Sequence, residues 1–165
     1  MEEILDVINE KNEVIRQAPR SEVEAKGLLY RTAEIIVFME GKIAIQKRAA
    51  NKTKRPSHYS IVGETVKAGE TFEEAAVRGV REELGLEARN LRKIGDKIVH
   101  DELYTDNMLM RLFTCEGEGR MEIDEGEVKE VKMLSVEEVQ GLIASGVKVT
   151  PCLVEGLRMY KEAIR

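Results

Sequence analysis

The chain has 165 residues, of which 42% are hydrophobic and 35% charged, and its formal net charge is −5. This length fits a single domain spanning residues 1–165, and the apolar content excludes disorder along the whole chain. A weakly acidic protein is a poor general nucleic-acid binder. The longest apolar run, residues 35–39, is far shorter than the ~20 residues that a membrane-spanning helix needs.

The N-terminus and the cysteines favour a cytoplasmic protein. The opening sequence MEEILDVINE is acidic and lacks the basic and apolar regions of a secretory signal. Cys115 and Cys152 are too few for a disulfide framework, which agrees with a reducing compartment.

The predicted elements mix hairpins with capped helices. Residues 4–17 predict an N-terminal hairpin, and a loop rich in Lys and Arg is expected at 49–58. Mixed strands and helices in this order predict an α/β (α+β) sandwich rather than a doubly wound sheet. Further strands are expected at residues 33–39, 42–48, 59–63, 91–99, 107–115 and 128–134, and helices at 71–84, 135–146 and 151–164.

The helix at residues 71–84 has the clearest signals. Thr71 is an N-cap candidate, Glu74 completes a capping box, and Gly85 stands where helices commonly end. Its apolar stripe includes Val80 and Leu84 and needs a sheet to cover it. We therefore expect this helix on one side of a mixed sheet and the C-terminal helices on the other.

The same helix carries a charged arc. At about 100° per residue, Arg78, Glu82 and Glu83 lie on one side, and Glu82 is one turn after Arg78, within pairing distance. Glu70 precedes the helix and can approach this arc. Converging carboxylates repel one another unless a cation is present, and oxygen-rich clusters suit Mg²⁺. The alternative is an ordinary solvated helix face, since Glu is a good helix former.

Residues 63–86, GETVKAGETFEEAAVRGVREELGL, resemble the Nudix box, whose pattern is G-x5-E-x7-R-E-U-x-E-E-x-G-U with U aliphatic. The order of the flanking segments is similar to the Nudix branch that also contains isopentenyl diphosphate isomerase. The resemblance implies a Nudix-type α/β/α sandwich with a mixed β-sheet. Seven positions match in register: Glu70, Arg78, Val80, Glu82, Glu83, Gly85 and Leu86.

Two positions depart from the pattern. Glu64 stands where the box has its first glycine, and Gly79 replaces the glutamate after Arg78, which is usually a metal ligand in the family. On the helical wheel, Gly79 leaves a hole within the carboxylate arc. Water, a substrate atom or the Glu64 carboxylate could fill this hole, and simple drift in a degenerate member is the alternative.

The resemblance implies a hydrolase that cleaves the diphosphate linkage of a nucleoside diphosphate-X or related small molecule by water attack at phosphorus. Mg²⁺ or Mn²⁺ would be the cofactor, since the ion neutralises charge and lowers the pKa of bound water. Glu82 and Glu83 would be metal ligands, with Glu70 as a further ligand or an orienting group. Arg78 would hold the carboxylates in place, and Glu64 is the candidate replacement ligand.

Residues outside the box supply further candidates. A general base is required, and Glu127 is the candidate, with Glu125 and Glu130 as competitors and an acidic surface loop as the alternative. Arg48 and Lys54 are candidates for binding substrate phosphate. They belong to a basic cluster that also contains Lys52 and Arg55, and the alternative is a solvated loop.

Two other functions fit parts of the sequence. Isopentenyl diphosphate isomerases place a catalytic Cys and a metal-binding His in the strand that enters the box, where this chain has Val62 and Glu64, which disfavours that chemistry. A catalytically impaired nucleotide-binding module is supported by Gly79, whereas the retained pair Glu82–Glu83 argues against it. The sequence leaves a homodimer open.

Overall fold

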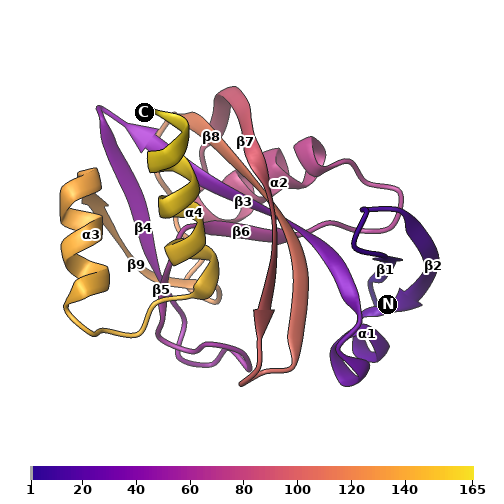
Figure 1. The fold of residues 1–165 in the computed structure, drawn as a ribbon. Helices are drawn as coiled ribbons and strands as arrows, with labels where there is room; N and C mark the ends of the chain where they lie inside the picture. Colours follow the sequence, from indigo (N-terminus) through magenta and orange to yellow (C-terminus); the bar gives the residue numbers. More distant parts are fainter. Residues whose placement is uncertain (1) are drawn as a thin grey trace.

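The structure is a computed structural model that describes residues 2–165. Groups of strands are separated by single helices and the chain ends in two helices, with a hairpin and a short helix before the main sheet (Figure 1). The strands are β1 (Ile4–Ile8), β2 (Val14–Pro19), β3 (Leu29–Met39), β4 (Lys42–Arg48), β5 (Tyr59–Ser60), β6 (Val62–Thr65), β7 (Glu87–Asp101), β8 (Asp106–Glu118) and β9 (Val128–Leu134). The helices are α1 (Arg20–Lys26), α2 (Phe72–Leu84), α3 (Val136–Ala144) and α4 (Pro151–Ala163).

A seven-stranded mixed sheet forms the centre of the fold. Its main path is β5-β4-β3-β8-β7, with β6 paired to β3 and β9 paired to β4. The pair β3–β8 is parallel and the other pairs are antiparallel. Strands β3 and β4 pair only near their connecting turn. Beyond it β3 pairs with β6 and β4 pairs with β5, so the two strands separate.

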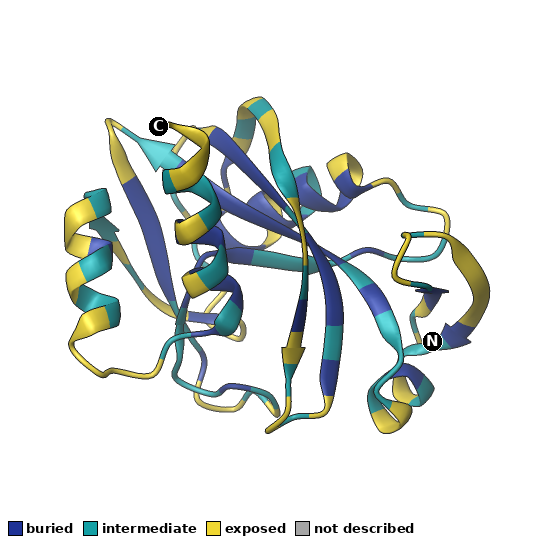
Figure 2. Ribbon diagram, viewed as in Figure 1, coloured by how far each residue is buried: buried dark blue, intermediate teal, exposed yellow. Residues whose placement is uncertain are grey.

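Helices cover both faces of this sheet, which confirms the predicted sandwich (Figure 1). Successive side chains of a strand point to opposite faces. Thus Ile35 of β3 packs in the same apolar cluster as Val80 of α2, whereas Ile36 packs in the cluster that contains Leu153 and Leu157 of α4. The central strands are buried, and the outer faces of the helices are exposed (Figure 2).

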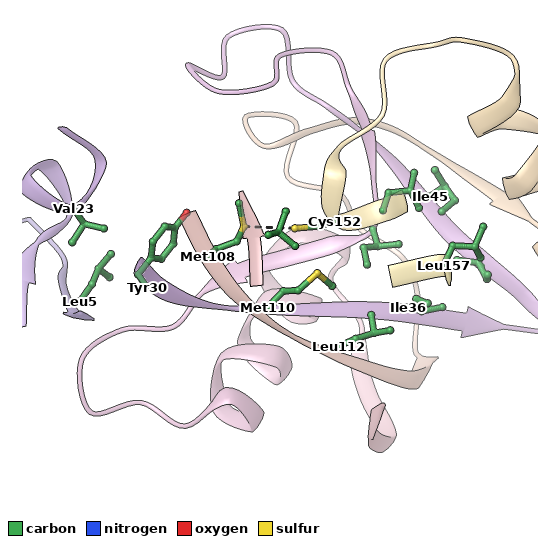
Figure 3. Close-up of a cluster of buried hydrophobic side chains, with 14 of the residues drawn as sticks. Leu5, Val23, Tyr30, Ile36, Ile45, Met108, Met110, Leu112, Cys152 and Leu157 are labelled. Carbon is green, nitrogen blue, oxygen red and sulfur yellow. Dashed lines mark hydrogen bonds between the residues drawn. The ribbon is translucent and has the colours of Figure 1, made fainter. Parts of the chain in front are cut away.

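The layer beneath α4 is close-packed and rich in sulfur (Figure 3). Met108 and Met110 are buried here, and Cys152 Sγ lies 3.6 Å from Met108 Sδ. This layer fixes the first turn of α4 against β8.

Local sequence signals explain the ends of helix α2. The Thr71 hydroxyl accepts a hydrogen bond from the Glu74 N–H, and the Glu74 carboxylate accepts one from the Thr71 N–H, both at 3.0 Å. Gly85 ends the helix in the left-handed region with φ 69°. The predicted capping box is confirmed, and it fixes where the carboxylate arc begins.

Several elements differ from the expectation, among them β3 and β8, which extend beyond the expected 33–39 and 107–115. Helix α1 is absent from the predicted elements, because it has seven residues, no side-chain cap and Val23 as its one buried residue. The expected strand at 59–63 is two strands, since Tyr59 and Ser60 pair with β4 whereas β6 pairs with β3. Strand β7 is longer than 91–99. None of the helices within residues 2–165 is long and apolar enough to cross a membrane.

Candidate functional site

A polar cavity of about 510 Å³ lies where β3 and β4 separate. Strands β3, β4 and β6, helix α2 and the first turn of α4 all contribute to its wall. Most of the residues predicted from the sequence line it: Arg48, Lys54, Glu64, Arg78, Glu82, Glu83 and Glu127. Glu70 and the two competing bases, Glu125 and Glu130, are outside this lining.

Arg78 connects the strand before the box helix to the carboxylate arc. Its guanidinium donates two hydrogen bonds to Glu70, at 3.0 and 2.9 Å, and one to the carbonyl oxygen of Thr65 at 2.9 Å. It also pairs with Glu64 at 3.1 Å and lies 3.6 Å from Glu82. Two parallel bonds to one carboxylate fix the guanidinium plane. The structure therefore places Glu70 as the partner that orients Arg78.

The two glutamates at the end of the arc have different environments. Glu83 is buried, and its Oε1 accepts a hydrogen bond from Gln46 Nε2 at 2.5 Å. Burial and the charge of Glu64 raise the pKa of Glu83 well above its usual value, although the Gln46 bond opposes this. Glu82 is exposed at the cavity rim.

The two departures from the box pattern lie against each other. Glu64 of β6 is opposite Ala33 of β3, which packs on the α2 side of the sheet, so Glu64 projects towards that helix. A Cβ atom added at Gly79 would lie 2.9 Å from Glu64 Cβ and 3.5 Å from its Oε2. Burial raises the pKa of Glu64 to about 7, although the charge of Arg78 opposes this rise. The side chain at position 64 thus occupies the space beside Gly79.

Cations also line the cavity wall. Arg48 donates hydrogen bonds to the carbonyl oxygens of Arg55 and Lys54, at 3.1 and 2.9 Å, and thereby shapes the loop that carries them. Lys54 lies 3.4 Å from Asp106. Arg48 has hydrogen bonds to carbonyl groups but no ion pair within the described residues. Its charge is therefore available to an anion in the cavity.

Glu127, the candidate base, lies near this cationic wall. Its carboxylate pairs with Lys52 at 2.5 Å, and both residues line the cavity. The backbone beside it is held by the hydrogen bond from Ala49 N–H to the Glu127 carbonyl at 3.1 Å. The structure thus joins the loop at 49–58 to the segment before β9.

Glu34 is a cavity residue that the sequence analysis missed. It lies in the middle of β3 and is buried, and burial raises its pKa to about 8, with the nearby Cys152 thiol and Arg48 opposing the rise. A carboxylate within an otherwise apolar strand was a signal that could have identified it. Asp106 and Gln46 also line the cavity, but no local pattern distinguishes them.

The donor set fits a hard divalent cation. Within residues 2–165, no three acidic, His or Cys side chains are gathered tightly enough to form a finished ligand set. Glu64, Glu82 and Glu83 nevertheless line one cavity, and repulsion between carboxylates contributes to the raised pKa values of Glu64 and Glu83. A cation there would relieve this repulsion, and carboxylate oxygens are the ligands that Mg²⁺ prefers.

Comparisons with known proteins agree with this geometry. The family described as NUDIX domain matches residues 29–153. A protein of Escherichia coli K12 named "Uncharacterized Nudix hydrolase YfcD" is 34% identical over 143 residues, which cover 83% of this chain and 76% of that protein. Another from Pseudomonas aeruginosa, "Uncharacterized Nudix hydrolase PA4841", is 26% identical and covers 98% of this chain and 95% of its own.

Solved structures share the fold. DR0079 from Deinococcus radiodurans has a TM-score of 0.78 and 25% identity, covering 94% of this chain and 98% of that one. A MutT NUDIX hydrolase from Burkholderia pseudomallei has a TM-score of 0.69 and 14% identity, covering 79% and 97%. The match over residues 29–153 and the relative at 34% identity lead to one conclusion: the chain belongs to the Nudix hydrolase family.

Proposed function

We propose that this protein is a divalent-metal-dependent hydrolase that cleaves the diphosphate linkage of a nucleoside diphosphate-X or related small molecule by water attack at phosphorus. The observation that carries the proposal is that one cavity is lined both by carboxylates of α2 and β6 and by cations of β4 and the loop at 49–58. A diphosphate needs both, because its own charge repels a nucleophile and must be neutralised.

The cationic wall would bind the substrate. Arg48 and Lys54 would contact phosphate oxygens, since Arg48 has no carboxylate partner and Lys54 is only loosely paired with Asp106 at 3.4 Å. Arg55 is less available, because Asp101 and Asp106 hold its guanidinium at 2.8 and 2.7 Å. It would position the loop rather than bind phosphate.

The carboxylate wall would hold Mg²⁺ or Mn²⁺ through Glu82, Glu83 and Glu64. When bound, this ion supplies charge neutralisation and lowers the pKa of water. Gln46 orients Glu83, Arg78 orients Glu64, and Glu70 holds Arg78 in turn. Glu70 would thus act as a positioning residue, which selects one of the two roles that the sequence left open.

Glu127 would act as the general base that accepts a proton from the attacking water. Of the three candidate glutamates, it is the one that lines the cavity. Its ion pair with Lys52 holds the carboxylate beside the loop at 49–58, where the substrate phosphates would lie.

A catalytically impaired nucleotide-binding module is the second candidate. Gly79 favours it, because the box glutamate is missing and Glu64 is paired with Arg78 at 3.1 Å. The branch shared with isopentenyl diphosphate isomerase, the cytoplasmic location and a homodimer stay predictions from the sequence.

A hydrolysis screen, in which ion-exchange chromatography separates the phosphorylated products from the substrate, distinguishes these functions. The substrates are nucleoside triphosphates, dinucleoside polyphosphates, nucleotide sugars, ADP-ribose and prenyl diphosphates, each with Mg²⁺, with Mn²⁺ and with EDTA. Metal-dependent turnover of at least one diphosphate supports the hydrolase. Tight binding in calorimetry without turnover would support the binding module instead.

A further inference from the structure

Three hydrogen-bonding side chains of the cavity wall are buried without a full set of partners. Thr32, Gln46 and Glu34 are 6%, 3% and 6% exposed, and all three line the cavity. Thr32 Oγ1 and Gln46 Oε1 have no hydrogen-bond partner among the described residues. Leaving a buried polar atom unpaired costs about 1–3 kcal/mol, so such atoms usually have a partner, which can be a water, an ion or a ligand.

The Glu34 carboxyl group is also available to a ligand. The two arginines whose charges stabilise it, Arg48 and Arg55, donate their hydrogen bonds elsewhere, to backbone carbonyls and to Asp101 and Asp106. The neighbouring polar group is the Cys152 thiol, which is a weak donor. Glu34 therefore lies at the cavity wall without an ion pair within residues 2–165.

The β3–β6 ladder makes room for this carboxyl group. Gly63 is the residue opposite Glu34, and a Cβ atom at position 63 would collide with Glu34 Oε2. Thr32 is two residues before Glu34 on the same face of β3. The glycine and the alternation of the strand thus place a hydroxyl and a carboxyl group side by side at the cavity wall.

The surroundings favour a polar, non-aromatic group. Tyr30 is the one aromatic residue in the described lining, and the whole residue is buried, with its hydroxyl bonded to Asp106 at 2.8 Å. No aromatic face is therefore offered for stacking by a nucleobase. Ile61 and Met108 are the main large apolar side chains of the wall, too few to cover a prenyl chain.

We propose that Thr32, Glu34 and Gln46 form a subsite that binds the hydroxyl groups of a compact sugar or polyol attached to the diphosphate. A carboxyl group and an amide oxygen accept hydrogen bonds from hydroxyl groups, and the Thr32 hydroxyl can donate or accept. This inference rests on the proposed function and names the part of the substrate that enters the cavity.

Two variants and a matched control test the subsite. Thr32→Val removes the hydroxyl while keeping the shape, and Gly63→Ala displaces the Glu34 carboxyl. Thr114→Val is the control, because Thr114 is a buried threonine of β8 outside the cavity lining. Thermal unfolding of each variant checks that it is folded. If Gly63→Ala does not fold, Thr32→Val still tests the subsite.

The measured quantity is a selectivity ratio. The kcat/KM for ribose 5-diphosphate is divided by that for methyl diphosphate, which has no hydroxyl groups on its organic part. We expect the sugar to be preferred by at least tenfold, and the ratio to fall at least tenfold in Thr32→Val and in Gly63→Ala but to persist in Thr114→Val. ADP and a prenyl diphosphate serve as competing substrates, and a preference for either would overturn the inference.

Binding separates this inference from the proposed function. Calorimetric titration of both diphosphates, with Ca²⁺ in place of Mg²⁺, measures their affinities in the absence of turnover. The ratio of these two affinities is then compared with the ratio of the kcat/KM values. Selective binding of the sugar without hydrolysis in the Mg²⁺ assay would contradict the hydrolase but support the subsite. Equal affinities for both diphosphates, or a ratio that Thr32→Val leaves unchanged, would refute the subsite even if hydrolysis is observed.

Discussion

Glu64 and Gly79 share one small space at the boundary between β6 and α2. Because a Cβ atom at position 79 would lie 2.9 Å from Glu64 Cβ, a glutamate at both positions would overfill this space. A glycine within a helix costs about 1 kcal/mol relative to alanine, so its presence needs a compensating reason. Room for the Glu64 carboxylate beside Glu83 is such a reason.

A double-mutant cycle tests whether Glu64 replaces the missing box glutamate. Glu64→Gly should lower Mn²⁺ affinity at least tenfold, measured by calorimetry and by the electron paramagnetic resonance of free Mn²⁺. Gly79→Glu alone should lower the free energy of unfolding by about 1–3 kcal/mol through overpacking. The double variant should regain stability and part of the affinity, because contacting residues are not additive. Unchanged Mn²⁺ affinity in Glu64→Gly would disprove the replacement.

Glu83 is the residue whose loss should be most costly at the metal site. Glu83→Gln keeps the shape but removes the charge, and we expect both Mn²⁺ affinity and kcat/KM to fall at least tenfold, about 1.4 kcal/mol each. Glu73→Gln is the matched control, since Glu73 lies in the first turn of the same helix and is exposed. Equal losses in both variants would mean that the change acts through the helix and not through the site.

At the scale of elements, ion pairs hold the loop at 49–58 against the β7–β8 turn and the start of β8. Arg55 has φ 51°, in the left-handed region, and its guanidinium pairs with Asp101 and Asp106, at the two ends of the β7–β8 turn. Tyr30 of β3 donates a hydrogen bond to the same Asp106 at 2.8 Å. One buried aspartate thus connects three elements around the cavity.

Asp106→Asn should show what this connection contributes and how it depends on pH. Burial alone would raise the pKa of Asp106, but the hydrogen bonds from Arg55 and Tyr30 and the charge of Lys54 lower it. A lowered pKa gives stability that is present above the unfolded value, about 3.9, and lost as the pH falls through the folded value. We expect the variant to lose about 2–4 kcal/mol at pH 7, measured by urea unfolding.

The pH series carries the decisive comparison. The difference between wild type and Asp106→Asn should shrink as the pH falls below about 4, because unfolded wild-type chains then bind a proton at Asp106 that the folded state, with its lowered pKa, does not yet bind. Asp96→Asn serves as the control, since its pair with Arg111 is exposed and should contribute about 1 kcal/mol or less. A difference that stays constant from pH 7 to pH 3.5 would contradict an electrostatic role for Asp106.

Elements with local signals could be predicted from the sequence, and those set by distant pairing could not. The capping box of α2 depends on two residues three positions apart, so the start of this helix could be predicted from the sequence. The division of residues 59–65 between β5 and β6 depends on which strand each half pairs with, β4 or β3. Helix α1 has no side-chain N-cap and only seven residues, so its start carries no local signal.

The same distinction applies to the site. The box gave Arg78, Glu82 and Glu83 because their spacing is local to one helix. Glu34 reaches the cavity through the β3–β6 ladder, and Arg55 reaches Asp106 across 51 positions of the chain, so neither arrangement could be derived from spacing. The contact between Glu64 and Gly79 could be predicted in part, because both residues depart from the pattern of the same motif.

At the scale of the whole molecule, the cavity lies where several parts of the fold meet. Strands β3, β4 and β6, α2, the first turn of α4 and the loop at 49–58 all contribute to its wall. Burial, together with repulsion between its carboxylates, raises the pKa values of Glu64 and Glu83 and disfavours the folded state relative to a neutralised site. A ligand that neutralises them should therefore stabilise the whole chain.

Thermal unfolding with and without Mn²⁺ measures this coupling. At a free Mn²⁺ concentration one hundred times the calorimetric Kd, linkage gives about 2.7 kcal/mol of added stability. For a chain of this size that corresponds to an increase in Tm of about 5–10 °C, and EDTA should reverse it. The Glu83→Gln variant should lose most of the increase at the same Mn²⁺ concentration, whereas Glu73→Gln should keep it. An increase that Glu83→Gln leaves intact would place the ion elsewhere on the molecule, because a ligand stabilises only through the residues that bind it.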